Sequence, residues 1–257
     1  MKSPIKFFLA AAGSLLMLSA GTAMAGSAAP GKANNVVLVH GSWADGSSWS
    51  DVIVRLQAAG LNVTAVQNPL TSLADDVAAT RRVLDQQDGP TVLVGHSYAG
   101  TVVSEAGVDP KVQSLVYVAA RAPDANEDFV ALSANYPTMP VRSGTQEHAG
   151  FVTLKQDAFL KYFASDVPHD KALALYAAQQ PIAKTLFSGR TSVAAWHGKP
   201  SWYAVSSEDQ TISPDLQRFL AKRMGATTIE LPSSHLSLVS HSREIADLIL
   251  EAAGRNP

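Results

Sequence analysis

The chain of 257 residues contains no cysteine and few charged residues, and each shortage excludes a class of protein. Without cysteine there is no disulfide framework, no thiol nucleophile and no cysteine-ligated metal site. Charged residues make up 16% of the chain and the formal charge is -2, so no basic excess points to a nucleic-acid partner. Histidines and carboxylates do not occur at metal-site spacing either, so we expect no metal and no other cofactor. The hydrophobic fraction of 46% is typical of a globular protein.

Residues 1–25 have the pattern of a signal peptide. Lys2 and Lys6 form a positive start, residues 7–20 are an uncharged apolar run, and Ala23-Met24-Ala25 is a cleavage motif. A membrane anchor is the alternative, but the apolar run is shorter than the roughly 20 residues that a span needs. We therefore expect an exported bacterial protein, periplasmic or secreted, with no membrane attachment after cleavage.

After a small-residue leader, expected to be flexible over residues 26–34, short apolar runs alternate with amphipathic segments. The runs are rich in β-branched residues, as strands buried on both faces of a parallel sheet are, and the other segments have apolar residues at helical spacing. Strands are predicted at residues 36–39, 62–66, 91–94, 112–118, 202–205 and 227–231, and helices at 49–59, 72–86, 99–107, 214–224 and 239–253. The alternation predicts an α/β protein with a doubly wound, mostly parallel sheet.

Residues 122–196 interrupt this alternation. They contain no convincing strand, whereas residues 154–164 and 169–179 have helical patterns. The segment is far longer than a crossover needs, so we predict a helical cap inserted between residues 35–121 and 197–257, which form the core. A disordered loop is the alternative, but the segment is too rich in aromatic residues for that. These are Phe151, Phe159, Tyr162, Phe163 and Tyr176.

The segment GHSYAG, residues 95–100, places a serine between two glycines. Such a pattern also occurs by chance in loops rich in small residues. Here a predicted strand precedes Ser97 and a predicted helix follows it, and in that context the segment resembles the nucleophile elbow of the α/β-hydrolase fold. His40-Gly41-Ser42-Trp43 is similar to the oxyanion loop of the same superfamily, and Pro232-Ser233-Ser234-His235 is similar to its histidine loop.

Within that superfamily the chain resembles small capped serine esterases related to plant methyl-ester esterases and hydroxynitrile lyases. The resemblance is carried by LVHGSWADGSSW (38–49), SSEDQTISPDLQ (206–217) and SSHLSLVSHSREIADLIL (233–250). It covers essentially everything after the leader and is weakest over the cap, where substrate specificity lies. Because one fold supports many activities, the site has to be assigned residue by residue.

A serine hydroxyl becomes a nucleophile when a base takes its proton, so a histidine must lie within reach of Ser97. The mature chain offers His40, His96, His148, His169, His197, His235 and His241. The resemblance implies His235, because the base of this superfamily follows the last strand. His241 belongs to a charged helix face and is expected to be solvated. The alternation of side chains along a strand predicts that His96 points away from Ser97.

The resemblance implies Asp209 as the acid of the triad. It follows the strand predicted at 202–205, and its carboxylate would accept a hydrogen bond from one imidazole nitrogen and leave the other free to act as base. Three other carboxylates remain alternatives. Glu208 is its neighbour, and Asp124 follows the strand before the cap, a position that some relatives use. Asp215 lies in the first turn of a predicted helix, where capping alone explains it.

Two backbone amides are expected to stabilise the oxyanion, those of Tyr98 and Ser42. Trp43, His40 and Leu236 are the candidate residues of the substrate pocket, although Trp43 could simply pack and His40 is more often structural in such a loop. Three glycines near these residues are interpreted as steric requirements rather than as chemical groups. They are Gly41, Gly95 and Gly100.

These assignments together predict a serine carboxylic-ester hydrolase that acts through an acyl-enzyme on a small to medium apolar ester. A lactonase or perhydrolase with the same triad is an alternative, and a catalytically silent binding protein is an alternative of another class. The lyases carry a threonine where this chain has Gly41 and a lysine where it has Leu236, so the resemblance favours the esterases. Neither the natural substrate nor the oligomeric state follows from these motifs.

Overall fold

The computed structural model describes Met1 and residues 32–256. The expected signal peptide beyond Met1, and the expected leader up to residue 31, lie outside the described residues. Close to the start of the described segment, Ala33 is fully buried and its amide donates a hydrogen bond to the carbonyl oxygen of Ala253, 3.0 Å away. The expectation of a flexible leader is therefore wrong at Ala33, because this backbone is attached to the end of the last helix.

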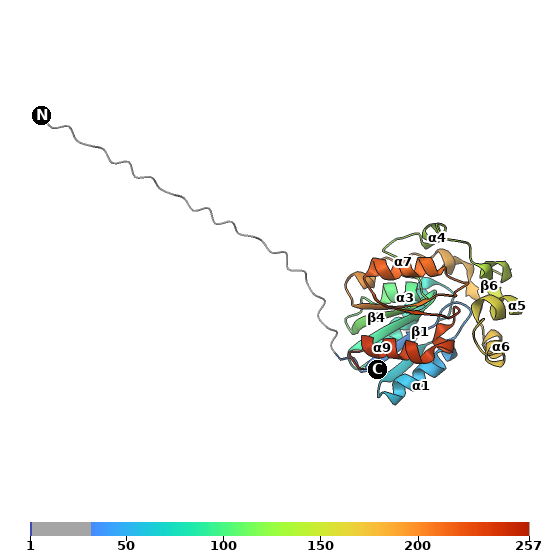
Figure 1. Ribbon diagram of the computed structural model, residues 1–257, viewed down its shortest axis with the longest axis horizontal. Helices are drawn as coiled ribbons and strands as arrows, with labels where there is room; N and C mark the ends of the chain where they lie inside the picture. The colour runs from blue at the N-terminus through green and yellow to red at the C-terminus, as the bar shows by residue number, and fades with distance from the viewer. Residues whose placement is uncertain (2–31, 257) are drawn as a thin grey trace.

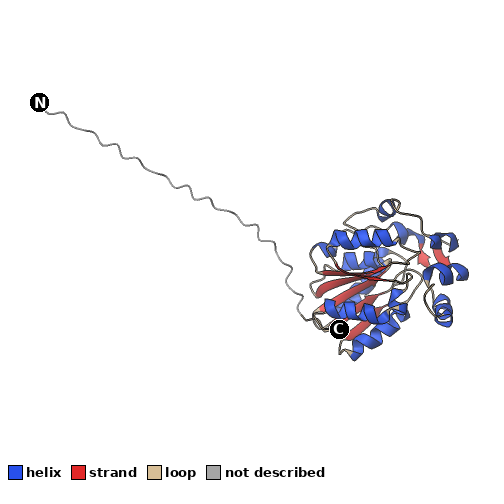
Figure 2. Cartoon of the chain, in the orientation of Figure 1, coloured by secondary structure: helices blue, strands red, loops and turns tan. Residues whose placement is uncertain are grey.

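A six-stranded parallel sheet forms the centre of the described chain (Figure 2). Its order is β2-β1-β3-β4-β8-β9. The strands are β1 (Asn35–Val39), β2 (Asn62–Val66), β3 (Thr91–His96), β4 (Val112–Val118), β8 (Ser201–Ser206) and β9 (Thr227–Leu231). The inner strands β1, β3 and β8 are buried along their whole length, whereas the edge strands β2 and β9 are partly exposed. Continuous burial explains the apolar runs of the inner strands and confirms the predicted parallel sheet.

Helices cover both faces of this sheet (Figure 1). On one face α1 (Ser50–Ala58) packs against α9 (Ser242–Ala252), and the other face carries α3 (Ala99–Ala106) and α7 (Pro214–Met224), with α2 (Leu73–Asp85) against α3. The helix predicted at 239–253 is interrupted. A short α8 (Ser237–Ser240) ends at His241, whose φ of -124° and ψ of 41° leave the helical region before α9 begins.

The register of the strands brings the predicted loops together at one edge of the sheet. Val39 pairs with Gly95, so the loop after β1 lies beside the loop after β3. His96 pairs with Val118, and Ser206 pairs with Leu231, so the loops after β4, β8 and β9 meet at the same edge. Active sites of open α/β sheets form at this carboxyl edge.

The segment 122–196 contains a small antiparallel sheet as well as helices, which corrects the prediction of a segment without strands. Its strands are β5 (Thr145–His148), β6 (Phe151–Leu154) and β7 (Ile182–Ala183), in the order β5-β6-β7. All four β5 residues are exposed, so this strand has no apolar alternation that the sequence could reveal. A turn at Ala149 and Gly150, both with positive φ, joins it to β6. Pairing with β7 depends on contacts across some thirty residues, which local patterns do not encode.

The helices of the same segment also differ in detail from the prediction. The pattern over 154–164 forms a single turn, α5 (Gln156–Ala158), followed by a π-helical turn, η3 (Phe159–Phe163). The pattern over 169–179 forms α6 (His169–Ala177). The remaining short elements are η1 (Gly46–Trp49), α4 (Phe129–Ser133), η2 (Pro140–Gly144), η4 (Lys184–Ser188) and η5 (Ala195–His197). Among the described residues, no helix has the length and apolar character of a membrane span.

Candidate active site

Ser97 lies on a strained turn between β3 and α3. Its φ of 56° is in the left-handed region, which a residue other than glycine seldom adopts. The turn is held by hydrogen bonds from the Ser97 amide to the carbonyl oxygen of Val118 (3.1 Å) and from the amides of Gly100 and Arg121 to the carbonyl oxygen of Ser97 (3.1 and 3.0 Å). Strain of this kind persists only where surrounding contacts over-determine it, and such residues concentrate at functional sites.

The glycines around Ser97 are required by close contacts. A Cβ at Gly41 would lie 2.7 Å from the Cβ of Ser97, and a Cβ at Gly95 would lie 2.7 Å from a methyl group of Val103. A Cβ at Gly100 would overlap the carbonyl oxygen of Arg121. These distances confirm that the three glycines are steric requirements.

His235 and Asp209 form a buried pair at the ends of neighbouring strands. Nδ1 of His235 lies 2.6 Å from Oδ2 of Asp209, and both side chains are inaccessible to solvent. Asp209 also accepts hydrogen bonds from the amides of Thr211 (2.7 Å) and Ile212 (3.1 Å) and from the side-chain amide of Gln217 (2.7 Å). A carboxylate only accepts, so the Nδ1 of His235 carries the proton that it donates to Asp209.

This tautomer leaves Nε2 of His235 as a bare acceptor. Nε2 is buried and has no hydrogen-bond partner in the described part of the chain, Ser97 included. Ser97 directly follows His96, whose ring centroid lies 4.8 Å from that of His235. Hydrogen bonds between nucleophile and base are often formed only when a substrate is bound, so the arrangement suits an imidazole that takes a proton from Ser97.

The alternative acids lie elsewhere. Asp124 pairs with the exposed His197 (Oδ1 to Nε2, 3.0 Å), and Asp215 pairs with Arg218 (2.7 Å) on the surface of α7. Glu208 is exposed. Of the four carboxylates that the sequence offered, the structure therefore brings only Asp209 into contact with His235.

His96 contacts His235, a contact that the sequence analysis did not predict. The ring of His96 is fully buried, and its Nε2 donates to the backbone carbonyl oxygen of His235 across 3.0 Å. Burial lowers the pKa of His96 well below its usual value, so the ring stays neutral. Local patterns could not reveal this contact, because it forms only when the loop after β9 folds over the end of β3. The one feature of the sequence that could have pointed to a role for His96 is its position directly before Ser97.

The amides of Ser42 and Tyr98 lie in the two loops that the pairing of β1 with β3 brings together. Neither amide donates a hydrogen bond to any described residue, so both are free to bind an oxyanion. The side chain of Tyr98 is turned away and donates from its hydroxyl to Oδ2 of Asp76 (2.9 Å). Asp76 also accepts from the amide of Leu70 (2.8 Å), and its burial raises its pKa to about 6.

His40 supports the oxyanion loop and does not line the pocket, which corrects its assignment as a pocket residue. Its ring is fully buried, Nδ1 donates to the carbonyl oxygen of Gly41 (3.0 Å), and Nε2 accepts from the amide of Asn68 (3.0 Å). Burial lowers the pKa of His40, in keeping with a neutral ring. With both nitrogens occupied by backbone groups, the side chain has no free nitrogen to hydrogen-bond a substrate.

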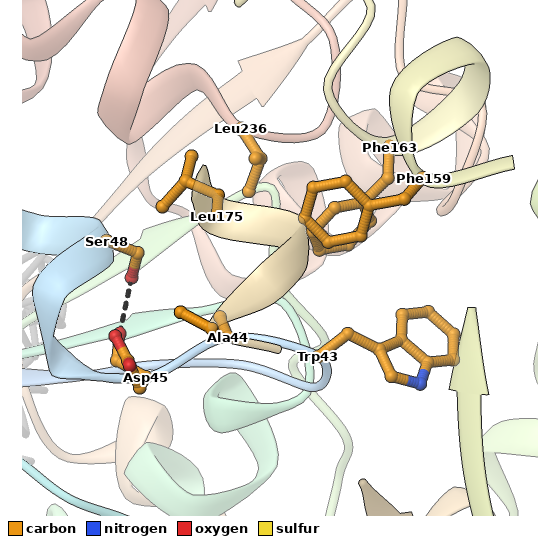
Figure 3. A pocket seen from close by; sticks show the side chains of 9 residues that line it. Trp43, Ala44, Asp45, Ser48, Phe159, Phe163, Leu175 and Leu236 are labelled. Carbon is orange, nitrogen blue, oxygen red and sulfur yellow. Dashed lines mark hydrogen bonds between the residues drawn. The ribbon is translucent and has the colours of Figure 1, made fainter. Parts of the chain in front are cut away.

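A narrow apolar pocket is lined in part by Leu236, the residue that follows His235 (Figure 3). Trp43 and Leu236, two of the candidate substrate-pocket residues, contribute to its wall. Phe163 contacts both the pocket wall and His235, because its ring centroid lies 5.8 Å from that of Trp43 and 5.0 Å from that of His235. The remaining lining residues are Ala44, Asp45, Ser48, Phe159, Leu175 and Ala178. Four lining residues, Phe159, Phe163, Leu175 and Ala178, come from the segment between β4 and β8.

Known proteins resemble this chain in sequence and in fold. A family model described as alpha/beta hydrolase family matches residues 36–248. The carbendazim hydrolyzing esterase of Nocardioides sp. (strain SG-4G) is 31% identical over 112 residues, which are 38% of this chain and 46% of that protein, so the match spans less than half of that relative. Salicylic acid-binding protein 2 of Nicotiana tabacum is 25% identical over 252 residues, covering 84% of this chain and 96% of that protein. The solved structure of polyneuridine aldehyde esterase superposes with a TM-score of 0.74 at 18% identity, covering 85% of this chain and 98% of that one.

Proposed function

Because this chain belongs to the alpha/beta hydrolase family, we propose that it is a serine carboxylic-ester hydrolase that works through an acyl-enzyme. The observation that carries the proposal is the buried contact between His235 and Asp209, which leaves Nε2 of His235 unpaired. That nitrogen belongs to a ring in contact with His96, the residue before the strained Ser97. A nucleophile, a base and a group that orients the base are the three parts that acyl transfer requires.

In the proposed mechanism Ser97 Oγ attacks the ester carbonyl carbon while Nε2 of His235 takes its proton. Asp209 holds the ring in the required tautomer and stabilises the imidazolium that forms. The amides of Ser42 and Tyr98 bind the negative oxygen of the tetrahedral intermediate. His235 then returns the proton to the leaving alcohol. A water molecule, activated by the same nitrogen, releases the acid and restores Ser97.

The lining of the pocket supports an apolar ester of small to medium size as the substrate. Trp43, Phe159, Phe163 and Leu236 form a narrow apolar wall, whereas Asp45 and Ser48 are its polar members. The names of the relatives support an ester as the substrate, since two of them are called esterases. The signal-peptide pattern of the first 25 residues further supports export to the periplasm or the medium, where such an enzyme would meet esters from outside the cell.

A serine-directed phosphonate and a panel of p-nitrophenyl esters of graded acyl length test the proposal. The wild-type protein should hydrolyse the shorter esters and should be labelled at Ser97, and Ser97→Ala should abolish both reactions while its circular dichroism stays unchanged. A panel extended to lactones, and to hydrogen peroxide as acyl acceptor, separates an esterase from a lactonase or perhydrolase with the same triad. Labelling of another residue, with Ser97→Ala still active, would contradict the assignment. A folded protein that neither turns over nor is labelled would instead be a silent binding protein.

A further inference from the structure

The π-helical turn η3 and the residues that follow it contact the loop that carries His235. The ring of Phe163 packs on the ring of His235, and the carbonyl oxygen of Phe163 lies 3.3 Å from Oγ of Ser234. π-Helical turns are rare and occur frequently at functional sites. This one also places Phe159 and Phe163 in the pocket wall. The same short segment thus contacts both the pocket and the base.

Asp166, three residues after this turn, makes two polar contacts with the loop that carries His235. Its Oδ2 accepts a hydrogen bond from the backbone amide of Ser234 (3.1 Å), and its Oδ1 accepts one from the hydroxyl of Ser234. Ser234 is buried and directly precedes His235. The two carboxylate oxygens of Asp166 therefore hold both donors of one residue, and this fixes the backbone from which the imidazole projects.

The opposite side of the loop is held by the core. His96 donates to the carbonyl oxygen of His235, and Asp209 accepts from its ring. Those contacts come from β3 and from the loop after β8, which the central sheet makes rigid. From the pocket-forming segment, Phe163 and Asp166 contact the loop that carries His235, and Asp166 is the residue of the two whose side chain accepts hydrogen bonds from that loop.

From these contacts we infer that Asp166 is a positioning residue, which sets the orientation of the His235 imidazole by holding Ser234. The inference rests on the proposed role of His235 as the base. A base must be aligned with its proton donor to within a fraction of an ångström for efficient transfer, so loosening its backbone lowers the rate of the chemical step. Asp166 does not line the pocket, and its loss should therefore affect kcat more than KM.

A second role for Asp166 has to be separated from this one. Oδ2 of Asp166 lies 3.9 Å from Nδ1 of His241, so the carboxylate could serve mainly as a partner of that imidazole. His241 also contacts the hydroxyl of Ser240 (3.0 Å) and does not touch His235 through any described hydrogen bond. If Asp166 acts by holding Ser234, His241→Gln keeps the wild-type kcat. If it acts through His241, that variant reproduces the effect of Asp166→Ala.

The test compares Asp166→Ala, Asp166→Asn and His241→Gln in the hydrolysis of p-nitrophenyl butyrate. Asp157→Ala is the matched control, because Asp157 is an exposed carboxylate of α5 that makes no described contact with the base loop. We expect kcat of Asp166→Ala to fall about tenfold or more at nearly constant KM, since a hydrogen bond to a charged group contributes on that order. Asp166→Asn should recover part of the rate, because its single amide oxygen still accepts from Ser234. The control should match the wild type.

A readout that needs no turnover is the low-field proton on Nδ1 of His235. In protein labelled with ¹⁵N-histidine, the signal is assigned by its absence in His235→Asn. Asp166→Ala should shift or broaden it by exchange with water, and Asp157→Ala should leave it unchanged. Wild-type kcat and an unaltered signal in Asp166→Ala would overturn the inference while leaving the esterase proposal intact. If the wild-type protein neither hydrolyses the esters nor is labelled at Ser97, the proposed function is overturned. The Nδ1 proton signal of His235 would still decide whether Asp166 orients that ring.

Discussion

The side chain of His96 donates a hydrogen bond from Nε2 to the backbone carbonyl oxygen of His235, and the two rings lie 4.8 Å apart. The residue before the candidate nucleophile thus supports the candidate base. A carbonyl oxygen only accepts, so the proton of His96 is on Nε2 and its Nδ1 is bare. Because burial keeps His96 neutral, it adds no positive charge beside the imidazolium that His235 becomes during the reaction.

We expect His96→Leu to lower kcat by about tenfold, because the carbonyl of His235 loses a buried donor. His96→Gln, whose side-chain amide can donate, should retain more activity. The acid limb of the pH–rate profile should keep its midpoint in both variants, because His96 is kept neutral by burial and contributes no titration of its own. Steady-state kinetics between pH 5 and 9 measure both effects, and a displaced limb would show that His96 itself takes part in proton transfer.

Asp209→Asn should reduce kcat by about 10⁴-fold, because the amide cannot hold the imidazole in the tautomer that leaves Nε2 free. Asp124→Asn is the matched control, since Asp124 contacts the exposed His197 instead of His235. It should stay close to the wild-type rate. A severe loss in Asp124→Asn together with a mild one in Asp209→Asn would assign the acid to the strand before the inserted segment.

Gly41→Ala should impair both folding and catalysis. The new methyl group would lie 2.7 Å from Cβ of Ser97 and 2.8 Å from the carbonyl oxygen of His96, so the elbow or the oxyanion loop must move. Crowding of this kind costs on the order of 1–3 kcal/mol. Gly89→Ala provides the comparison, because no atom lies within 4 Å of its Cβ position. Urea unfolding should show a loss of stability for Gly41→Ala and little change for Gly89→Ala, and equal stabilities would contradict the close contact.

Asp76 should make stability depend on pH. Its pKa is raised from 3.8 to about 6 in the folded protein, chiefly by burial, so between those values the folded state binds the proton more tightly than the unfolded state. Below pH 3.8 the carboxyl is protonated in both states, and above about pH 6 it is ionised in both. Stability is therefore lost as pH rises through this window, by about 3 kcal/mol in total.

The variant Asp76→Asn isolates this contribution. The unfolding free energy of the wild type relative to the variant should fall between pH 3.5 and 6.5 and then level off. Other titrating groups cancel in that difference, because they are common to both proteins. A difference that is flat over this range, or that rises with pH, would show that burial does not raise the pKa of Asp76.

The protein should cleave esters and release no cyanide from mandelonitrile. Leu236 follows His235, is buried, and forms part of the pocket wall. Cyanide departs with a negative charge that requires a nearby cation, and no lysine lies between Lys222 and the C-terminus. Cyanide release measured beside hydrolysis of a short p-nitrophenyl ester decides the point. Efficient cyanohydrin cleavage without ester hydrolysis would reverse the assignment.

Much of the fold follows from the sequence because it depends on local patterns. The inner strands are buried along their whole length, so their apolar runs mark them, and amphipathic spacing marks the helices between them. The elbow at Ser97 is also local, since neighbouring glycines leave the space that a strained turn requires. His235 follows from its place after the last strand, through resemblance to a superfamily in which the order of the triad is constant.

Tertiary structure alone decided which distant groups meet. Asp209 and Asp124 each follow a strand, and only the packing of the loop after β8 against the loop after β9 brings Asp209 to His235. His96 and Asp166 hold the base loop from two sides, through contacts that join residues 139 and 68 positions apart. The exposed strand β5 likewise exists because of its partners. The spacing of apolar residues indicates which face of a helix or strand is buried. It does not indicate which distant residue packs against that face, because the fold as a whole determines that contact.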